Sequence, residues 1–112
     1  MSLGLNGSSA GAGGGCVVGT YTGDGSSNVT LSFDAPVKAL IVTAPFKSGY
    51  SGTYLFNAIC INGEFRALST GVNASQSPSP VYGTYTTSGN SVTLSNAIFK
   101  ANGVAYDYIA FF

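Results

Sequence analysis

The sequence predicts an all-β protein folded as an antiparallel β-sandwich, jelly-roll-like, with about eight short strands. From residue 16 onward, short runs of β-branched and aromatic residues alternate with polar ones, which is the pattern of half-buried strands. Turn-forming residues interrupt these runs roughly every 8–12 residues, a spacing typical of sandwiches and barrels. Gly and Pro are spread along the chain, so no helix longer than one or two turns is expected.

The first strands follow from this alternation. Residues 16–22 (CVVGTYT) predict a strand with Val18 on one face and Gly19 on the other. Gly23-Asp24-Gly25 is a typical turn sequence. Residues 28–33 (NVTLSF) alternate strictly and predict a half-buried strand, which Asp34-Ala35-Pro36 ends.

The centre of the chain is more apolar. Residues 37–44 (VKALIVTA) predict a central strand buried on both sides and ended by Pro45, and residues 48–52 predict a loop. Residues 53–61 and 64–68 flank Asn62-Gly63, and an Asn-Gly pair between strands is the strongest short-range signal for a hairpin with a type I′ turn.

The last third predicts two more turns. After a polar loop over residues 69–80, residues 81–86 and 91–95 predict a hairpin. Residues 104–112 (VAYDYIAFF) predict the terminal strand. Asn102-Gly103 is a second candidate type I′ turn, returning to a strand at 97–100.

The chain divides into an N-terminal arm over residues 1–15 and a sandwich domain over residues 16–112. Gly, Ser and Ala dominate the arm, and such a segment is a flexible coil unless something holds it. We interpret it as an irregular assembly arm that docks to neighbouring subunits, with Leu3, Leu5 and Asn6 as candidate contacts.

Charge excludes several classes of protein. Only 7% of the residues are charged, four cations balance four anions, and there is no His. Nucleic-acid binding needs clustered cations, so no nucleic-acid partner is expected. No apolar run reaches the roughly 18 residues of a spanning helix, and no cation precedes Lys38 as in a secretory signal, so no membrane insertion is expected. A His-based triad or metal site is impossible.

The remaining chemistry gives no catalytic or cofactor site, and we expect the protein not to be an enzyme. The carboxylates are far apart in sequence, whereas a glycosidase needs two facing one bond. Asp107, between two tyrosines, is interpreted as an outward charge that protects an edge strand. Asp24 offers oxygen ligands for calcium, but a single carboxylate favours an Asx-type turn.

Two cysteines are too few for a typical zinc site. Cys16 and Cys60 each lie in an apolar run, which favours two buried thiols acting as small hydrophobic residues. Spacing alone leaves a disulfide between them open. Among the seven tyrosines, Tyr50 and Tyr82 are in or beside Ser- and Gly-rich loops. They are the candidate surface contacts, with caps at the core edge as the alternative.

The chain contains one internal echo. Residues 19–22 and 83–86 both read Gly-Thr-Tyr-Thr, and each is followed by a turn and then by Val-Thr-Leu-Ser, at residues 29–32 and 92–95. Two explanations stay open: convergent turn chemistry, and two equivalent hairpins in a two-fold-like sandwich.

Both ends of the domain carry a family resemblance. Residues 19–25 (GTYTGDG), followed by residues 29–42 (VTLSFDAPVKALIV), resemble the opening of small β-domains in phage and prophage tail-fibre or minor virion structural proteins. Residues 102–111 (NGVAYDYIAF) resemble their closing strand. The chain differs by Val37, inserted between Pro36 and Lys38, and by a shorter loop before the closing strand. The resemblance does not extend over residues 45–100, and it implies a virion structural protein of either tail or head.

These observations favour a phage virion structural protein, either a tail-fibre or receptor-binding tip or a capsid decoration subunit. It would assemble in the host cytoplasm and leave the cell within the virion. Its expected partners are further copies of itself, other virion proteins and a host-surface glycan, with loops 45–52 and 69–80 projecting outward. One alternative is a stand-alone carbohydrate-binding module that stacks sugars on Tyr50 or Tyr82. The other is a subunit of an extracellular filament, in which the arm adds a strand to the next subunit.

Overall fold

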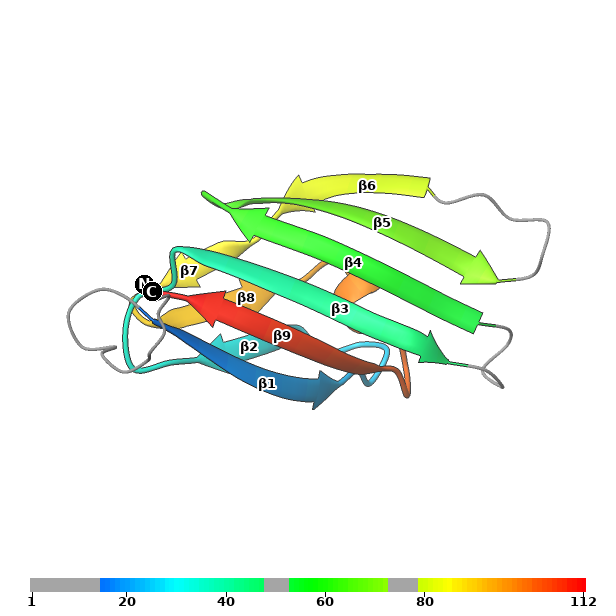
Figure 1. Ribbon diagram of the computed structural model, residues 1–112, viewed down its shortest axis with the longest axis horizontal. Helices are drawn as coiled ribbons and strands as arrows, with labels where there is room; N and C mark the ends of the chain where they lie inside the picture. The colour runs from blue at the N-terminus through cyan, green and yellow to red at the C-terminus, as the bar shows by residue number, and fades with distance from the viewer. Residues whose placement is uncertain (1–14, 48–52, 73–78) are drawn as a thin grey trace.

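A computed structural model confirms the all-β sandwich and describes residues 15–47, 53–72 and 79–112. The described residues form two antiparallel sheets of six and three strands (Figure 1). The larger sheet has the order β1-β9-β3-β4-β5-β6 and the smaller one β2-β8-β7. The elements are β1 (Cys16–Thr22), β2 (Val29–Ser32), β3 (Ala39–Lys47), β4 (Thr53–Ile61), β5 (Glu64–Val72), β6 (Ser79–Thr84), β7 (Thr86–Ser88), β8 (Ser91–Leu94), the 3₁₀ helix η2 (Ala97–Phe99) and β9 (Ala105–Phe111).

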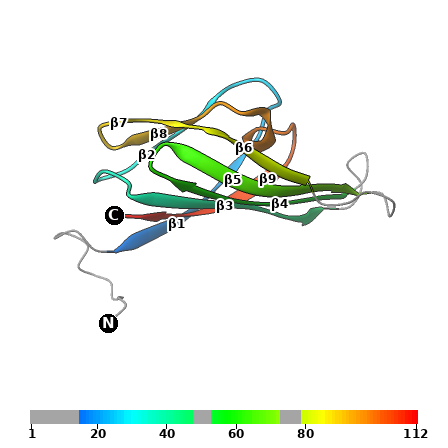
Figure 2. The same cartoon turned by 90° about the horizontal axis from the view of Figure 1, so that it is seen from above.

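The core lies between the two sheets, which Figure 2 shows as separate layers. The larger sheet contributes the fully buried side chains of Leu40, Val42, Cys60, Phe65 and Tyr106, and the smaller one those of Val92 and Leu94. Phe65 meets the ring of Phe99 edge to face, with the ring centroids 4.9 Å apart. The strands that contribute to this core, such as β2, β8 and β9, direct alternate residues inward, as their sequences predict.

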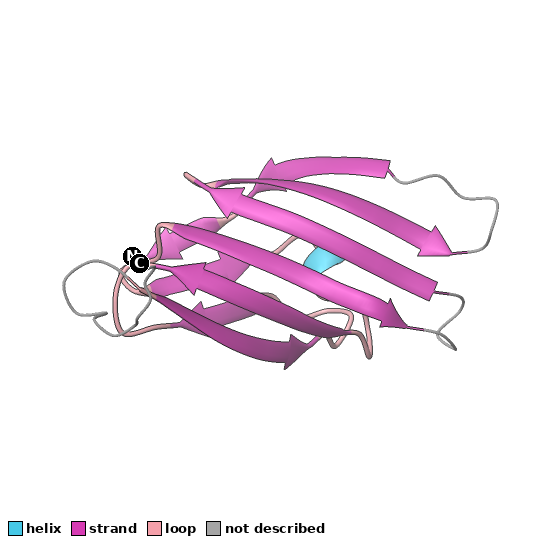
Figure 3. Ribbon diagram, in the orientation of Figure 1, coloured by secondary structure: helices cyan, strands magenta, loops and turns pink. Residues whose placement is uncertain are grey.

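Residues 97–100 do not form the predicted return strand. Residues 97–99 form η2, the one helical segment in the described chain (Figure 3, cyan). The hydroxyl of Tyr106 donates to the carbonyl of Ile98 at 2.8 Å and accepts from the backbone N–H of Ala101 at 3.0 Å. Tyr21, stacked on Tyr106 at 4.8 Å, donates to the carbonyl of Phe99 at 2.7 Å. The contact from Tyr21, 78 residues away in the sequence, fixes this segment against β1, whereas the contacts of Tyr106 join it to a residue nearby in the sequence.

The two candidate type I′ turns differ in outcome. Asn62 and Gly63 have φ values of 56° and 81°, so both take the left-handed conformation that a type I′ turn requires, and β4 pairs with β5 as predicted. Asn62 is the one non-glycine residue with positive φ in the described chain. At the second site only Gly103 has positive φ, so the prediction of a type I′ turn at Asn102-Gly103 was wrong.

Several strands are longer than predicted. β3 passes through Pro45 to Lys47, with a shift in its pairing register between Ala44 and Lys47, which accommodates a proline that cannot donate a ladder hydrogen bond. β5 continues to Val72, and β6 already begins at Ser79. The expected loops 45–52 and 69–80 are therefore shorter, and what remains of them, residues 48–52 and 73–78, lies outside the described residues.

The hairpin predicted over residues 81–95 is divided between the two sheets. β6 pairs with β5 in the larger sheet, whereas β7 pairs with β8 in the smaller one. The chain crosses between the layers at Tyr85, whose side chain is buried and whose backbone N–H donates to the carbonyl of Gly63 at 3.0 Å.

The internal echo corresponds to a two-fold-like arrangement. Its Gly-Thr-Tyr-Thr segments start in β1 and β6, the two edge strands of the larger sheet. Its Val-Thr-Leu-Ser segments coincide with β2 and overlap most of β8, and these two strands pair with each other. Thr30 and Thr93, equivalent in the echo, are directly paired. In each repeat the chain crosses from the larger sheet to the smaller one between the two segments. Neither repeat is therefore a hairpin, and that part of the two-fold explanation was wrong.

The two cysteines have different environments. Cys60 is buried, as predicted, but Cys16 is exposed at the start of β1, and both are free, which excludes a disulfide between them in this structure. Burial raises the pKa of the Cys60 thiol to about 12. A disulfide reagent at pH 8 is therefore expected to label one thiol quickly in the native protein and both in denaturant, as mass spectrometry would show. Rapid native labelling of Cys60 would contradict the packing described here.

Candidate functional site

The outward face of the six-stranded sheet is unusually apolar. The strand register aligns outward-facing side chains in a row across all six strands, and from β1 to β6 these are Val18, Ile109, Ile41, Ile59, Arg66 and Tyr82. The next row adds Phe111 of β9 and Ile61 of β4. We call Val18, Ile41, Ile59, Ile61, Ile109 and Phe111 the aliphatic face.

Val18, Ile59, Ile61 and Phe111 are exposed in the single chain, whereas Ile41 and Ile109 are half-buried. Val18 is 69% exposed, Ile59 53% and Ile61 47%. Scattered exposed apolar residues are normal, but a contiguous group on four adjacent strands is typical of an interaction surface. β3 lies at its centre, and the prediction that this strand is buried on both sides was wrong for the outward side, because the three-stranded sheet covers only the inner one.

The opposite outer surface of the sandwich has another character. The outward side chains of the three-stranded sheet are all hydroxyl-bearing: Thr30, Ser32, Thr86, Ser88, Ser91 and Thr93. Thr30 contacts Thr93 and Ser32 contacts Ser91 across the strands, with the hydroxyl oxygens 3.2 Å apart in both pairs. We call this the hydroxyl face. Water can hydrogen-bond these hydroxyl groups, so covering the surface lowers the free energy only at the aliphatic face.

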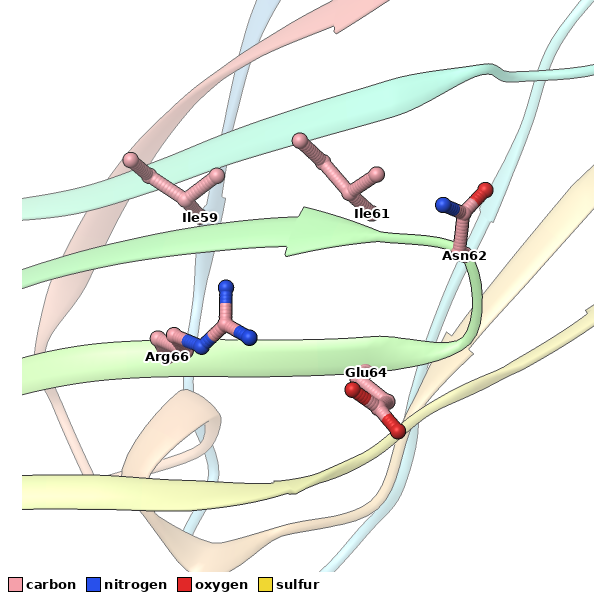
Figure 4. Close-up of a pocket in the computed structure, with 5 residues that line it drawn as sticks. All are labelled: Ile59, Ile61, Asn62, Glu64 and Arg66. Atoms are coloured by element: carbon pink, nitrogen blue, oxygen red, sulfur yellow. The ribbon is translucent and has the colours of Figure 1, made fainter.

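Charged side chains flank the aliphatic face. Figure 4 shows Ile59 and Ile61 of β4 beside Arg66 of β5, whose guanidinium points toward β4. Together with Asn62 and Glu64 they line a shallow depression of about 220 Å³. Asp107 is also exposed on this side, and it belongs to β9, which pairs with the edge strand β1. The prediction that Asp107 protects an edge strand was therefore wrong, because β9 is paired on both sides.

Of the candidate contact residues, Tyr82 is the one that the structure describes. It lies within β6, not in a loop, and its ring is 69% exposed on the outward side beside Arg66. It is thus a surface residue and does not cap the core. Tyr50 and the arm residues Leu3, Leu5 and Asn6 lie outside the described residues.

A second hollow, of about 600 Å³, lies where β1, the end of β2 and the C-terminal residue meet. Its aromatic lining residues contact one another: the ring of Phe33 lies 5.9 Å from that of Tyr108 and 5.7 Å from that of Phe112, both edge to face. The three rings also pack against the core cluster. They therefore close one side of the sandwich.

The Asx-type turn predicted at Asp24 is present. One carboxylate oxygen accepts from the backbone N–H groups of Ser26 at 2.8 Å and Ser27 at 2.7 Å. The four carboxylates of the chain lie on separate elements, and among the described residues no three His, Cys, Asp or Glu side chains form a metal-binding group. No described helix has the length and hydropathy to cross a bilayer.

The turn at Asp24 leads to a prediction about pH. Hydrogen bonds from the side chain of Ser27 and from the backbone of Ser26 and Ser27 lower the pKa of Asp24 from 3.8 to about 2. Because the folded pKa is depressed, the stabilising contribution of the ionised group is present above about pH 4 and is lost as the pH falls toward 2. An NMR titration of the Asp24 carboxyl carbon should give a midpoint near 2. In a Ser27→Ala variant the midpoint should move toward 3.8, and an unchanged midpoint would contradict the assigned cause.

The chain matches no protein-family model, no curated protein and no solved structure.

Proposed function

We propose that the protein is a phage virion structural protein that acts by assembly and adhesion, without catalysis, and that the aliphatic face is the surface that joins it to its neighbours. The exposure of this face on four adjacent strands carries the proposal. Covering apolar surface is the dominant favourable term in protein association. A chain with 7% charged residues and zero net charge has little electrostatic repulsion to oppose that contact.

The resemblance of the chain ends supports the virion setting. The two resembling segments include the end of β1, from Gly19 to Thr22, and all of β9, and they pair from Gly19↔Tyr108 to Thr22↔Ala105. Segments far apart in the sequence thus lie side by side, and the second of them contributes Ile109 and Phe111 to the aliphatic face.

The test is incorporation into particles. In cells that carry the encoding phage or prophage, particles are banded on a density gradient and the protein is detected with an antibody. We expect the wild-type protein in the particle band, together with a Thr30→Asp control altered on the hydroxyl face. Wild-type protein that stays with the free proteins at the top of the gradient would overturn the proposal.

One observation favours a carbohydrate-binding module as the second candidate. Tyr82 offers an exposed ring beside the guanidinium donors of Arg66, which is an arrangement that can stack a sugar ring and bind its hydroxyl groups. On a glycan array, this function requires binding that Tyr82→Ala removes and Tyr82→Phe retains. Binding that survives Tyr82→Ala would exclude this site.

A further inference from the structure

We infer that the aliphatic face binds the same face of a second copy of this chain, forming a symmetric dimer whose two-fold axis runs parallel to the strands, between β3 and β4. The inference rests on the proposed function of this face as an assembly surface, and it names the partner. Three observations support it: the size of the face, the placement of its charges, and its self-complementary register.

The outward side of the six-stranded sheet, of which the aliphatic face is the part on β1, β9, β3 and β4, is large enough for a dimer. Six strands at about 4.8 Å spacing, each with about six residues at 3.4 Å, give a sheet area of roughly 500–600 Å². Two such sheet surfaces together bury roughly 1,000–1,200 Å², which reaches the roughly 1,000 Å² that a specific interface needs. Two sheets that pack face to face in this way lie about 10 Å apart, with interdigitated side chains, as within an ordinary β-sandwich.

The charges are placed symmetrically about the proposed axis. In the sheet order, β9 and β5 are each one strand removed from the β3–β4 boundary, on opposite sides. β9 carries Asp107 and β5 carries Arg66. A rotation about this axis brings β9 of one copy over β5 of the other. Arg66 then lies one row from Asp107 of the second copy, and the contact is made twice because the dimer is symmetric.

The strand register also brings apolar residues of the two copies into contact. Ile41 of β3 pairs with Ile59 of β4 in the row nearest the centre of the face. The rotation places Ile41 against Ile59 of the second copy, so the centre of the contact is aliphatic on both sides. Glu64, the first residue of β5, is in the same row as Ile61 and Phe111, so the rotation places it against Phe111 of the second copy, at the end of the contact next to the Asn62-Gly63 turn.

The other two-fold axis in the plane of contact is unfavourable. An axis perpendicular to the strands, through the same row, would place each strand over the same strand of the second copy. Arg66 would then face Arg66 of the second copy. Like charges placed together are costly, whereas the axis parallel to the strands separates the two guanidinium groups. The charge pattern thus selects the axis parallel to the strands.

A charge-swap cycle tests this inference. The dissociation constant of the full-length chain is measured by sedimentation equilibrium for the wild type, Arg66→Asp, Asp107→Arg and the double variant, with circular dichroism to verify the fold. We expect each single substitution to weaken the dimer by about tenfold or more, because it places like charges together. The double variant should return to within about threefold of the wild type, since the opposite charges are again paired.

Either of two results would overturn the inference: a wild-type chain that is monomeric at about 1 mM, or a double variant that is as weak as the single ones. Thr30→Arg, which adds a cation to the hydroxyl face, is the matched control and should leave the dissociation constant unchanged. The particle gradient distinguishes a failure of the dimer from a failure of the virion function. A dimer that is absent from particles would refute the virion function only, and a particle protein that is monomeric in solution would refute the dimer only.

Discussion

An Ile59→Asp substitution is expected to weaken self-association at least about 100-fold while the monomer stays folded. Ile59 lies beside the proposed two-fold axis, where a carboxylate would be buried against Ile41 of the second copy without a partner. Burying an unpaired charge costs several kcal/mol, and 2.7 kcal/mol already corresponds to about 100-fold. In the monomer the side chain is 53% exposed, so the fold loses only part of its packing. Sedimentation equilibrium gives the association, and thermal unfolding at low concentration gives the stability.

Thr30→Asp is the control for this prediction. It adds the same charge to a strand position on the hydroxyl face, where water solvates it, and should leave association within about twofold of the wild type. If Ile59→Asp associates as tightly as Thr30→Asp, the aliphatic face is not the contact surface. If Ile59→Asp unfolds the monomer, the more conservative Ile59→Thr, which keeps the β-branch, is expected to weaken the dimer by about tenfold.

A Gly83→Val substitution is expected to destabilise the fold by about 3 kcal/mol, because overpacking at a rigid site costs this much. Gly83 in the edge strand β6 pairs directly with Phe65 of β5, and the ring of Phe65 lies over the glycine. A Cβ atom at position 83 would lie 2.6 Å from one ring carbon and 2.7 Å from another. The ring cannot yield easily, because Phe65 is fully buried and packs against Phe99.

Urea unfolding followed by circular dichroism measures this effect. Thr84→Val, one residue further along the same strand with its side chain exposed, is the matched control and should stay within about 0.5 kcal/mol of the wild type. A Gly83→Val protein as stable as this control would mean that Phe65 does not cover β6. A parallel effect is expected at Gly19, where a Cβ atom would overlap the ring and hydroxyl group of Tyr108.

Much of the fold could be predicted from local patterns. Strict alternation at residues 28–33 indicated the correct inward face of β2, the apolar run at residues 104–112 indicated β9 with Asp107 outward, and the Asn62-Gly63 pair indicated the turn between β4 and β5. These features depend on neighbouring residues alone. The crossing at Tyr85 and the position of η2 depend instead on partners far away in the sequence, Gly63 for Tyr85 and Tyr21 for Phe99, so no local pattern could reveal them.

The aliphatic face was partly visible in the sequence. Residues 37–44 are apolar at nearly every position, a pattern that predicts a strand buried on both sides. The prediction was wrong for the single chain, because the second sheet has only three strands and covers one side. A partner on the other side would complete the burial that the sequence indicates. The pattern thus describes the strand as it would be in the assembly, and periodicity alone cannot tell a second sheet of the same chain from that of another copy.

The most direct measurement is an isotope-filtered NOE experiment on a mixed sample, in which half of the chains carry ¹³C-labelled isoleucine methyl groups and half are unlabelled. The filter selects contacts between different chains and removes those within one. The account predicts contacts between the methyl groups of Ile41 in one chain and Ile59 in the other, and none from Thr30 or Thr93 on the hydroxyl face. Intermolecular contacts from the hydroxyl face, or a sample without any contact at Ile41 and Ile59 at about 1 mM, would contradict the central claim that this face is covered by a second copy.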